Sequence, residues 1–193
     1  MDMTERTTEH TRPYEGVIVN VDLDKVELPN GRIAKREIVR HPGGVAVVPL
    51  NDDGTVTLVR QYRYAFSQVL TEIPAGKLDP GEEPRAGALR ELGEEVGAQV
   101  GELVDLGTMY PSPGFSHEVL YLYLARDITY GDCHPDEDEF LEVVRVPFDT
   151  LVEQVMGGEI KDGKTVAAVL KTKVLIGKDL SNRQERFVRD FAA

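Results

Sequence analysis

The segment GKLDPGEEPRAGALRELGEEVGA, residues 76–98, carries the strongest structural and chemical signal in this chain. It holds six acidic residues, three basic residues and five glycines. Asp79-Pro80-Gly81 is typical of a turn. From about Glu83 the spacing of apolar residues becomes helical, and Gly97 stands where a left-handed residue would end the helix. The expected apolar stripe of this helix consists of Leu89, Leu92 and Val96.

The same helix would carry carboxylates on a second face. Glu91 and Glu95 are four residues apart and share a face roughly opposite the apolar stripe, with Glu94 beside them. Like charges at this spacing are mildly destabilising unless something neutralises them, and no lysine or arginine occurs between residues 91 and 98. A solvated helix face is one interpretation. The other is a site for a hard divalent cation such as Mg²⁺, which takes oxygen ligands.

The segment resembles the Nudix box, in which a glycine, an arginine and several glutamates recur at fixed spacing. The eight matching positions are Gly76, Glu82, Arg90, Glu91, Leu92, Glu94, Glu95 and Gly97. The departure is Ala98, where a larger aliphatic residue is usual; it affects packing rather than chemistry. The resemblance implies hydrolysis of a nucleoside diphosphate linked to another group, with Mg²⁺ or alternatively Mn²⁺ as the cofactor.

The resemblance also implies roles for individual residues. Glu91 and Glu95 would be the main metal ligands, assisted by Glu94 and the carbonyl of Ala75. Arg90 would orient the glutamates of the box, which makes Arg90 and Glu94 part of the expected catalytic set. Glu82 would act as Arg90 does or reach a metal through water.

Other stretches resemble the ADP-ribose pyrophosphatase branch of this family, and together the resemblance covers roughly residues 14–175. They are VRQYRYA, EIPAGKLDPGE, DEDEFLEV and a proline, Pro113, sixteen residues beyond Gly97. Pro113 also fits an ordinary Pro-Gly turn. In this branch two subunits exchange N-terminal β regions and share the active site. The substrate-binding residues that the resemblance implies are Arg36, supplied by the other subunit, with Arg63, Pro113 and Glu118.

The general base is expected outside the box, on the acidic loop HPDEDEF. Matching the strand that follows this loop to the family places the base at Glu137, with Glu139 as the alternative. Four consecutive acidic residues are also typical of a solvated loop. A carboxylate there could take a proton from water if its surroundings set its pKa appropriately.

Composition limits the class of protein. The chain has 193 residues, 41% of them hydrophobic, and a net charge of -12. This charge argues against nucleic acid or an anionic membrane as a partner, because both require a basic face. The single cysteine, Cys133, suits a reducing compartment, and no apolar run approaches the roughly 18 residues of a membrane span. We therefore expect a cytoplasmic protein.

The pattern of elements predicts an α+β fold, and the resemblance to the Nudix family implies the Nudix form of it, a mixed sheet between helices. Residues 1–42 are expected to form a loose tail, up to residue 13, and a β-hairpin turning at Pro29-Asn30-Gly31 that mediates a homodimer. Residues 43–178 would form the hydrolase domain, with Asp149 as a helix N-cap, and residues 179–193 a helical tail.

The expected function is Mg²⁺-dependent hydrolysis of ADP-ribose, or a related ADP-sugar, to AMP and ribose 5-phosphate. One alternative is a pyrophosphatase for other nucleoside diphosphate sugars or dinucleotides. A second alternative, from another class, is a ligand-binding Nudix module without catalysis. The retained carboxylates of the box argue against this second alternative, because a non-catalytic ligand-binding module does not need them.

Overall fold

The computed structural model describes residues 1–134 and 140–191, so both candidate bases, Glu137 and Glu139, lie outside the described residues. Three sheets are present. The N-terminal sheet has the order β1 (Arg6–Glu15), β2 (Asn20–Glu27), β3 (Ile33–Arg40). The second has the order β10 (Leu141–Pro147), β5 (Thr55–Arg63), β6 (Gln68–Glu72). The third has the order β7 (Ala75–Lys77), β4 (Gly44–Pro49), β9 (Leu120–Tyr130), β8 (Ala98–Met109).

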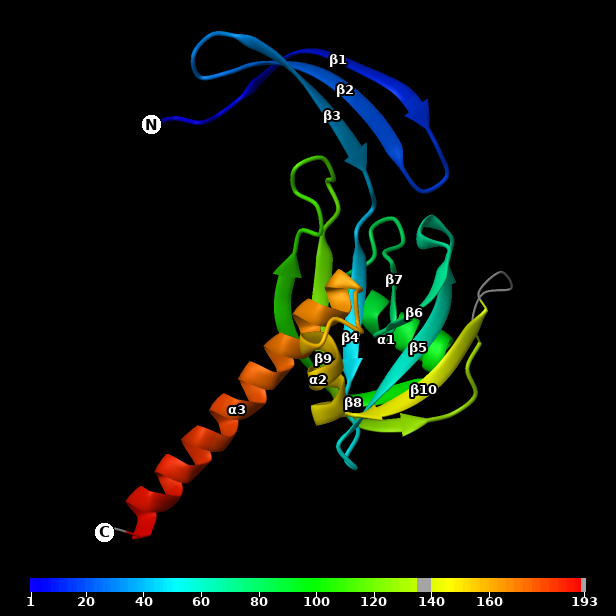
Figure 1. Cartoon of the computed structure of the whole chain (residues 1–193), viewed down its shortest axis with the longest axis vertical. Coiled ribbons are helices and arrows are strands. Elements are labelled where there is room, and N and C mark those ends of the chain that lie inside the picture. The colour runs from blue at the N-terminus through cyan, green and yellow to red at the C-terminus, as the bar shows by residue number, and fades with distance from the viewer. Residues whose placement is uncertain (135–139, 192–193) are drawn as a thin grey trace.

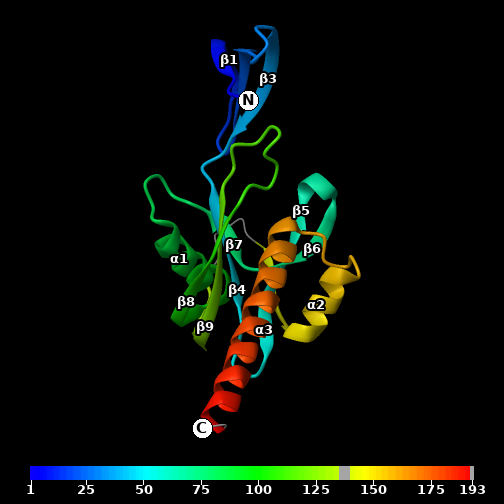
Figure 2. The same ribbon diagram turned by 90° about the vertical axis from the view of Figure 1, so that its left-hand side faces the viewer.

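The helices lie on both sides of the third sheet. They are α1 (Pro84–Val96), α2 (Phe148–Met156) and α3 (Gly163–Phe191), with a short 3-10 turn at Tyr64–Phe66. Figure 2 shows α1 on one side of β4 and β9, with α2 and α3 on the other. The expected α+β fold, a mixed sheet between helices, is confirmed. The mixture arises because β4 pairs parallel with β9, whereas the remaining ladders are antiparallel.

Strand β4 shows why the core has two halves. All six of its residues are buried, and successive side chains point to opposite faces of the sheet. Ala46 and Val48 pack into a cluster with residues of α2 and α3, including Leu151. Val45 and Val47 pack into a second cluster with residues of α1 and β8. Helix α1, which carries the glutamates of interest, is therefore held against a buried central strand.

The N-terminal sheet stands away from the rest of the chain, at the opposite end from the projecting α3 (Figure 1). The predicted hairpin is confirmed as β2 and β3, and Gly31 in its turn has a φ of 80°. The predicted loose tail of residues 1–13 is wrong from Arg6 onward, because β1 pairs with β2. Polar contacts that sequence periodicity does not report hold β1 in place: Arg12 Nε donates to Asp22 at 2.7 Å.

Two further details concern the helices. The prediction of Asp149 as the N-cap of α2 is wrong: Pro147 occupies that position, and Asp149 lies in the first turn. The N–H of Phe148 donates to the carbonyl of Gly54, so tertiary contact rather than a capping side chain fixes this helix start. In the described part of the chain, no helix combines the length and apolar character needed to cross a membrane.

Candidate active site

Helix α1 turns Glu91 and Glu95 inward, on the same buried side as Leu92 and Val96, so the prediction that the two glutamates lie roughly opposite the apolar stripe is wrong. The predicted end at Gly97 is confirmed, with a φ of 65° and its N–H donating to the carbonyl of Gly93. The predicted stripe is only partly right: Leu92 and Val96 are buried, but Leu89 is 39% exposed. The buried side of the helix consists of Gly87, Ala88, Glu91, Leu92, Glu95 and Val96. The carboxylates of the box thus adjoin the core.

The reason for this placement is the backbone of β7, which runs beside the helix. The carboxylate Oε2 of Glu95 accepts a hydrogen bond from the N–H of Ala75 at 3.0 Å. A Cβ added to Gly76 would lie 2.0 Å from the carboxylate of Glu91, so the absence of a side chain at Gly76 makes room for that carboxylate. Glu91 is 9% exposed and Glu95 is 3% exposed. Two box carboxylates therefore lie against a two-residue stretch of main chain.

Arg90 links the loop before the helix to the helix itself. Its guanidinium makes two hydrogen bonds to Glu82, each 2.9 Å, and one to the carbonyl of Lys77 at 3.0 Å. It also donates to Glu91 at 2.9 Å and to Glu94 at 2.8 Å, which confirms the expected contact with Glu94 four residues on. The hydrogen bond from Arg90 lowers the pKa of Glu82 to about 2 and, reciprocally, raises the pKa of Arg90.

A cleft of about 600 Å³ opens beside these residues. Four sequence-predicted or box positions line it: Arg63, Ala75, Gly76 and Glu118. His41, Tyr110, Asp162 and Lys164 also line it and were not expected from the sequence. His41 Nδ1 lies 3.7 Å from the carboxylate of Glu118.

Two predicted substrate-binding residues lie elsewhere in this chain. Arg36 is on β3 in the N-terminal sheet, where it makes an ion pair with Glu5. Pro113 is an exposed residue of the loop between β8 and β9 and does not line the cleft. Its neighbours Tyr110 and Pro111 do line it. A single copy of the chain thus brings Arg63 and Glu118 together but leaves Arg36 and Pro113 outside the cleft.

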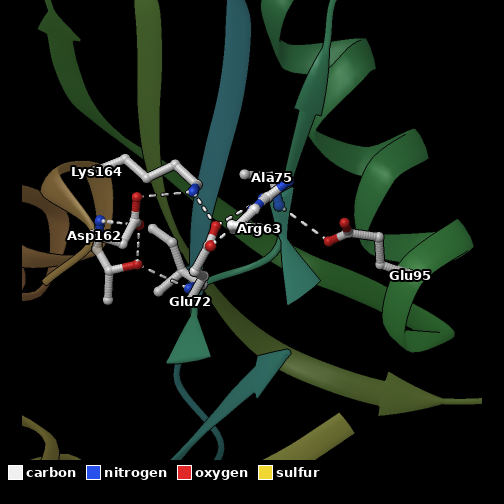
Figure 3. A network of polar contacts seen from close by, with 8 residues as sticks. Arg63, Glu72, Ala75, Glu95, Asp162 and Lys164 are labelled. Atoms are coloured by element: carbon white, nitrogen blue, oxygen red, sulfur yellow. Dashed lines mark hydrogen bonds and ion pairs between the residues drawn. The ribbon is translucent and has the colours of Figure 1, made fainter. Parts of the chain in front are cut away.

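A buried carboxylate, Glu72, connects two of the cleft cations (Figure 3). Arg63 donates to it through Nε at 2.8 Å and Nη2 at 2.7 Å, and Lys164 contacts it as well. Burial by itself would raise the pKa of Glu72, but the hydrogen bond from Arg63 and the charge of Lys164 outweigh it and lower the pKa. Glu72 occurs in the EIPAG stretch, yet sequence gave no sign that Lys164, 92 residues away, would reach it.

The donor chemistry of the box suits a hard cation. Glu91 and Glu95 supply carboxylate oxygens next to the main chain of Ala75, and Mg²⁺ and Mn²⁺ prefer such oxygen ligands. Within residues 1–134 and 140–191, no group of three or more His, Cys, Asp or Glu side chains converges into a metal centre. Glu91 and Glu94 instead both contact Arg90. The carboxylate ligands of the box therefore have the chemistry that a divalent cation requires, while Arg90 contacts three of them, Glu82, Glu91 and Glu94.

Comparison with known proteins places this geometry in context. The profile of the NUDIX domain matches residues 40–169. An ADP-ribose pyrophosphatase of Bacillus subtilis (strain 168) is 40% identical over 169 residues, covering 86% of this chain and 91% of that protein. A methanol dehydrogenase activator of Bacillus methanolicus is 41% identical over 167 residues, covering 86% and 90%. A crystal structure of an ADP compounds hydrolase superposes with a TM-score of 0.82 at 22% identity, covering 93% of this chain and 98% of that one.

Proposed function

This chain belongs to the Nudix family, and on that premise we propose that it hydrolyses the diphosphate of ADP-ribose to AMP and ribose 5-phosphate. The observation that carries the proposal is one wall of the cleft. There, Ala75 and Gly76 contact the carboxylates of Glu95 and Glu91, while Arg63 lines the same cleft. Carboxylate oxygens that can bind a divalent cation, next to the guanidinium of Arg63, suit a substrate with two linked phosphates.

The glutamates of the box have a defined part in this proposal. Glu91 and Glu95, with Glu94 and the carbonyl of Ala75, would hold Mg²⁺ or Mn²⁺. A divalent cation at such a site neutralises phosphate charge and activates water for attack on phosphorus. Arg90 orients the carboxylates through its hydrogen bonds to Glu82, Glu91 and Glu94.

The general base in this proposal is Glu137, with Glu139 as the alternative. Support comes from the resemblance of the surrounding sequence to the ADP-ribose pyrophosphatase branch. The base would accept a proton from the attacking water, and the phosphate bridge would then break to release AMP and ribose 5-phosphate.

Arg63 and Glu118 would contact the substrate from within the chain, and Arg36 and Pro113 would belong to a site completed by a second copy. The separate N-terminal sheet supports this dimer, because it exposes Leu23 and Ile33. Within the described residues, its backbone hydrogen bonds to the domain join Val39 to Phe115 and His117. Sedimentation equilibrium of the full chain would give twice the 21.4 kDa chain mass; a monomer at micromolar concentration would contradict the dimer. We propose the cytoplasm as its compartment, on the composition given above.

A substrate panel tests the proposed activity. Purified protein with Mg²⁺ or Mn²⁺ is incubated with ADP-ribose, other ADP-sugars, GDP-sugars and dinucleotides, and nucleoside monophosphate release is measured chromatographically. Preferred release of AMP from ADP-ribose supports the proposal. Preference for another compound would move the function to the other diphosphate sugars or dinucleotides. No turnover of any compound would leave a ligand-binding Nudix module.

A further inference from the structure

Resting on the proposed function, we propose that Lys164 is a second substrate-binding cation and that the buried Glu72 positions both Lys164 and Arg63 toward the diphosphate. Arg63 and Glu72 come from the adjacent strands β5 and β6, whereas Lys164 comes from the first turn of α3, 92 residues beyond Glu72. Figure 3 shows the carboxylate of Glu72 between the two cations. Arg63 and Lys164 together form an anion-binding site with two cations, and Glu72 contacts both of them.

The three members of this network differ in whether they line the cleft. Arg63 and Lys164 line the cleft, whereas Glu72 does not, and Glu72 is only 1% exposed. A ligand in the cleft therefore meets the cations and not the carboxylate. Two of the five N–H donors of Arg63 are directed to Glu72. Among the described residues, Arg63 donates hydrogen bonds to Glu72 alone, while the charges of Asp162 and Glu95 act on it from nearby, so its other N–H groups can donate to phosphate oxygens in the cleft.

Lys164 is held by a chain of contacts that runs back to β6. Asp162 accepts a hydrogen bond from the N–H of Thr165 at 3.0 Å, which caps the start of α3. The hydroxyl of Thr165 accepts one from the N–H of Ile73, also at 3.0 Å. Because Ile73 follows Glu72 directly, this contact fixes the start of α3 against the strand that carries Glu72. The ammonium of Lys164 also lies 3.0 Å from Asp162.

Charge balance accounts for the need for Glu72. Two cations side by side in a partly buried wall would repel each other, and one carboxylate shared between them offsets that repulsion. Asp162 supplies a second negative charge on the Lys164 side. The resting network is therefore close to neutral. A substrate diphosphate would gain hydrogen bonds from two charged donors whose geometry is already fixed, which limits the entropic cost of binding.

A purely structural role for Lys164, neutralising a buried carboxylate, makes a different prediction, and a matched pair of variants separates the two. Lys164→Met removes the cleft cation. Lys173→Met removes another lysine of α3, which pairs with Asp149 at 2.7 Å on the surface. Calorimetric titration with ADP-ribose in EDTA, where turnover is suppressed, gives Kd for each variant and for the unmodified chain.

We expect Lys164→Met to raise Kd about tenfold or more, since one charged hydrogen bond to phosphate is lost, and Lys173→Met to leave Kd within about twofold. With Mg²⁺, Lys164→Met should raise KM far more than it lowers kcat. Lys164→Gln, which keeps an N–H donor toward Glu72, replaces Lys164→Met if the latter lowers the melting temperature. It should raise Kd in the same direction, because it also lacks the charge.

The positioning role of Glu72 is tested by a double-mutant cycle. Glu72→Gln should raise the Kd for ADP-ribose. The fold increase in Kd of the double variant Glu72→Gln/Lys164→Met should be smaller than the product of the two single-variant fold increases, because both substitutions remove the same contact between Glu72 and Lys164. Equal Kd values for Lys164→Met and Lys173→Met, or no ADP-ribose binding by the unmodified chain, would overturn the inference. Absence of AMP release despite normal binding would instead contradict the proposed function, so the two failures are distinguishable.

Discussion

The carboxylate of Glu91 lies directly over Gly76, at 2.0 Å from the place a Cβ would occupy. This relationship explains why the chain needs a glycine at the start of the box: the backbone of β7 must approach the helix closely enough to pack under a carboxylate. A substitution at position 76 should therefore change the position of the Glu91 carboxylate, although residue 76 has no side chain that takes part in the reaction.

Gly76→Ala should therefore displace Glu91 and lower activity at least tenfold, with a loss of unfolding free energy of about 1–3 kcal/mol from overpacking. The matched control is Gly93→Ala, also within residues 76–98, where an added Cβ meets nothing within 4 Å. Because Gly93 is inside a helix, the control should be neutral or stabilising by about 0.5–1 kcal/mol. Urea denaturation and AMP release measure the two effects; equal behaviour of the two variants would contradict the steric account.

Arg90→Gln should lower activity about 10–100-fold, because the hydrogen bonds that gather Glu82, Glu91 and Glu94 are lost. The matched control is Arg60→Gln, which removes an exposed arginine of β5 paired with Glu142 on β10, the adjacent strand of the same sheet. An exposed pair contributes at most about 1 kcal/mol, so the control should retain stability and activity. Steady-state kinetics of both proteins checks this, and full activity of Arg90→Gln would refute the orienting role.

The contact between Glu82 and Arg90 predicts a specific acid sensitivity. The pKa of Glu82 is lowered from 4.5 to about 2 in the folded chain by the hydrogen bond from Arg90. A carboxylate with a depressed folded pKa contributes stability above its unfolded pKa and loses that contribution as pH falls through the folded value. The difference in unfolding free energy between the unmodified chain and Glu82→Gln should thus be constant above about pH 5 and shrink toward pH 2. A difference independent of pH over this range, measured by urea titration, would show that the ion pair is not its source.

The identity of the base is separable by two single substitutions in the acidic loop. If Glu137 accepts the proton from water, Glu137→Gln should lower kcat by about 10²–10⁴-fold, while Glu139→Gln has a small effect. The reverse result would assign the base to Glu139. Equal, mild losses in both variants, measured at saturating ADP-ribose, would mean that neither residue is the base.

Much of the fold was predictable because it depends on local chemistry. Gly97 ends α1 since only glycine adopts its left-handed conformation without strain, and the Pro29-Asn30-Gly31 turn sets the register of the hairpin. The burial of α1 was less predictable. Helical periodicity favoured Leu89 as a core residue, but the close approach of β7 turned the face with Glu91 and Glu95 inward instead.

The parts that sequence did not predict depend on long-range polar contacts. Strand β1 is made of polar, exposed residues and forms because ion pairs such as Arg12 with Asp22 join it to β2. Likewise, Lys164 reaches Glu72 only because α3 starts against β6. The sequence around a lysine at the start of an amphipathic helix does not indicate which carboxylate it contacts. The position of Lys164 in the cleft could therefore be recognised only in the tertiary structure.

The most direct test of the central claim compares AMP release from ADP-ribose by the unmodified chain and by Glu95→Gln, each with Mg²⁺ and with EDTA. Glu95 is buried, accepts the N–H of Ala75 and belongs to the proposed metal-binding set. We predict that the unmodified chain releases AMP with Mg²⁺ and not with EDTA. The rate of AMP release by Glu95→Gln with Mg²⁺ should be lower by at least about 10³-fold, with an unchanged circular dichroism spectrum. Turnover by Glu95→Gln at the rate of the unmodified chain, or turnover in EDTA, would contradict the account.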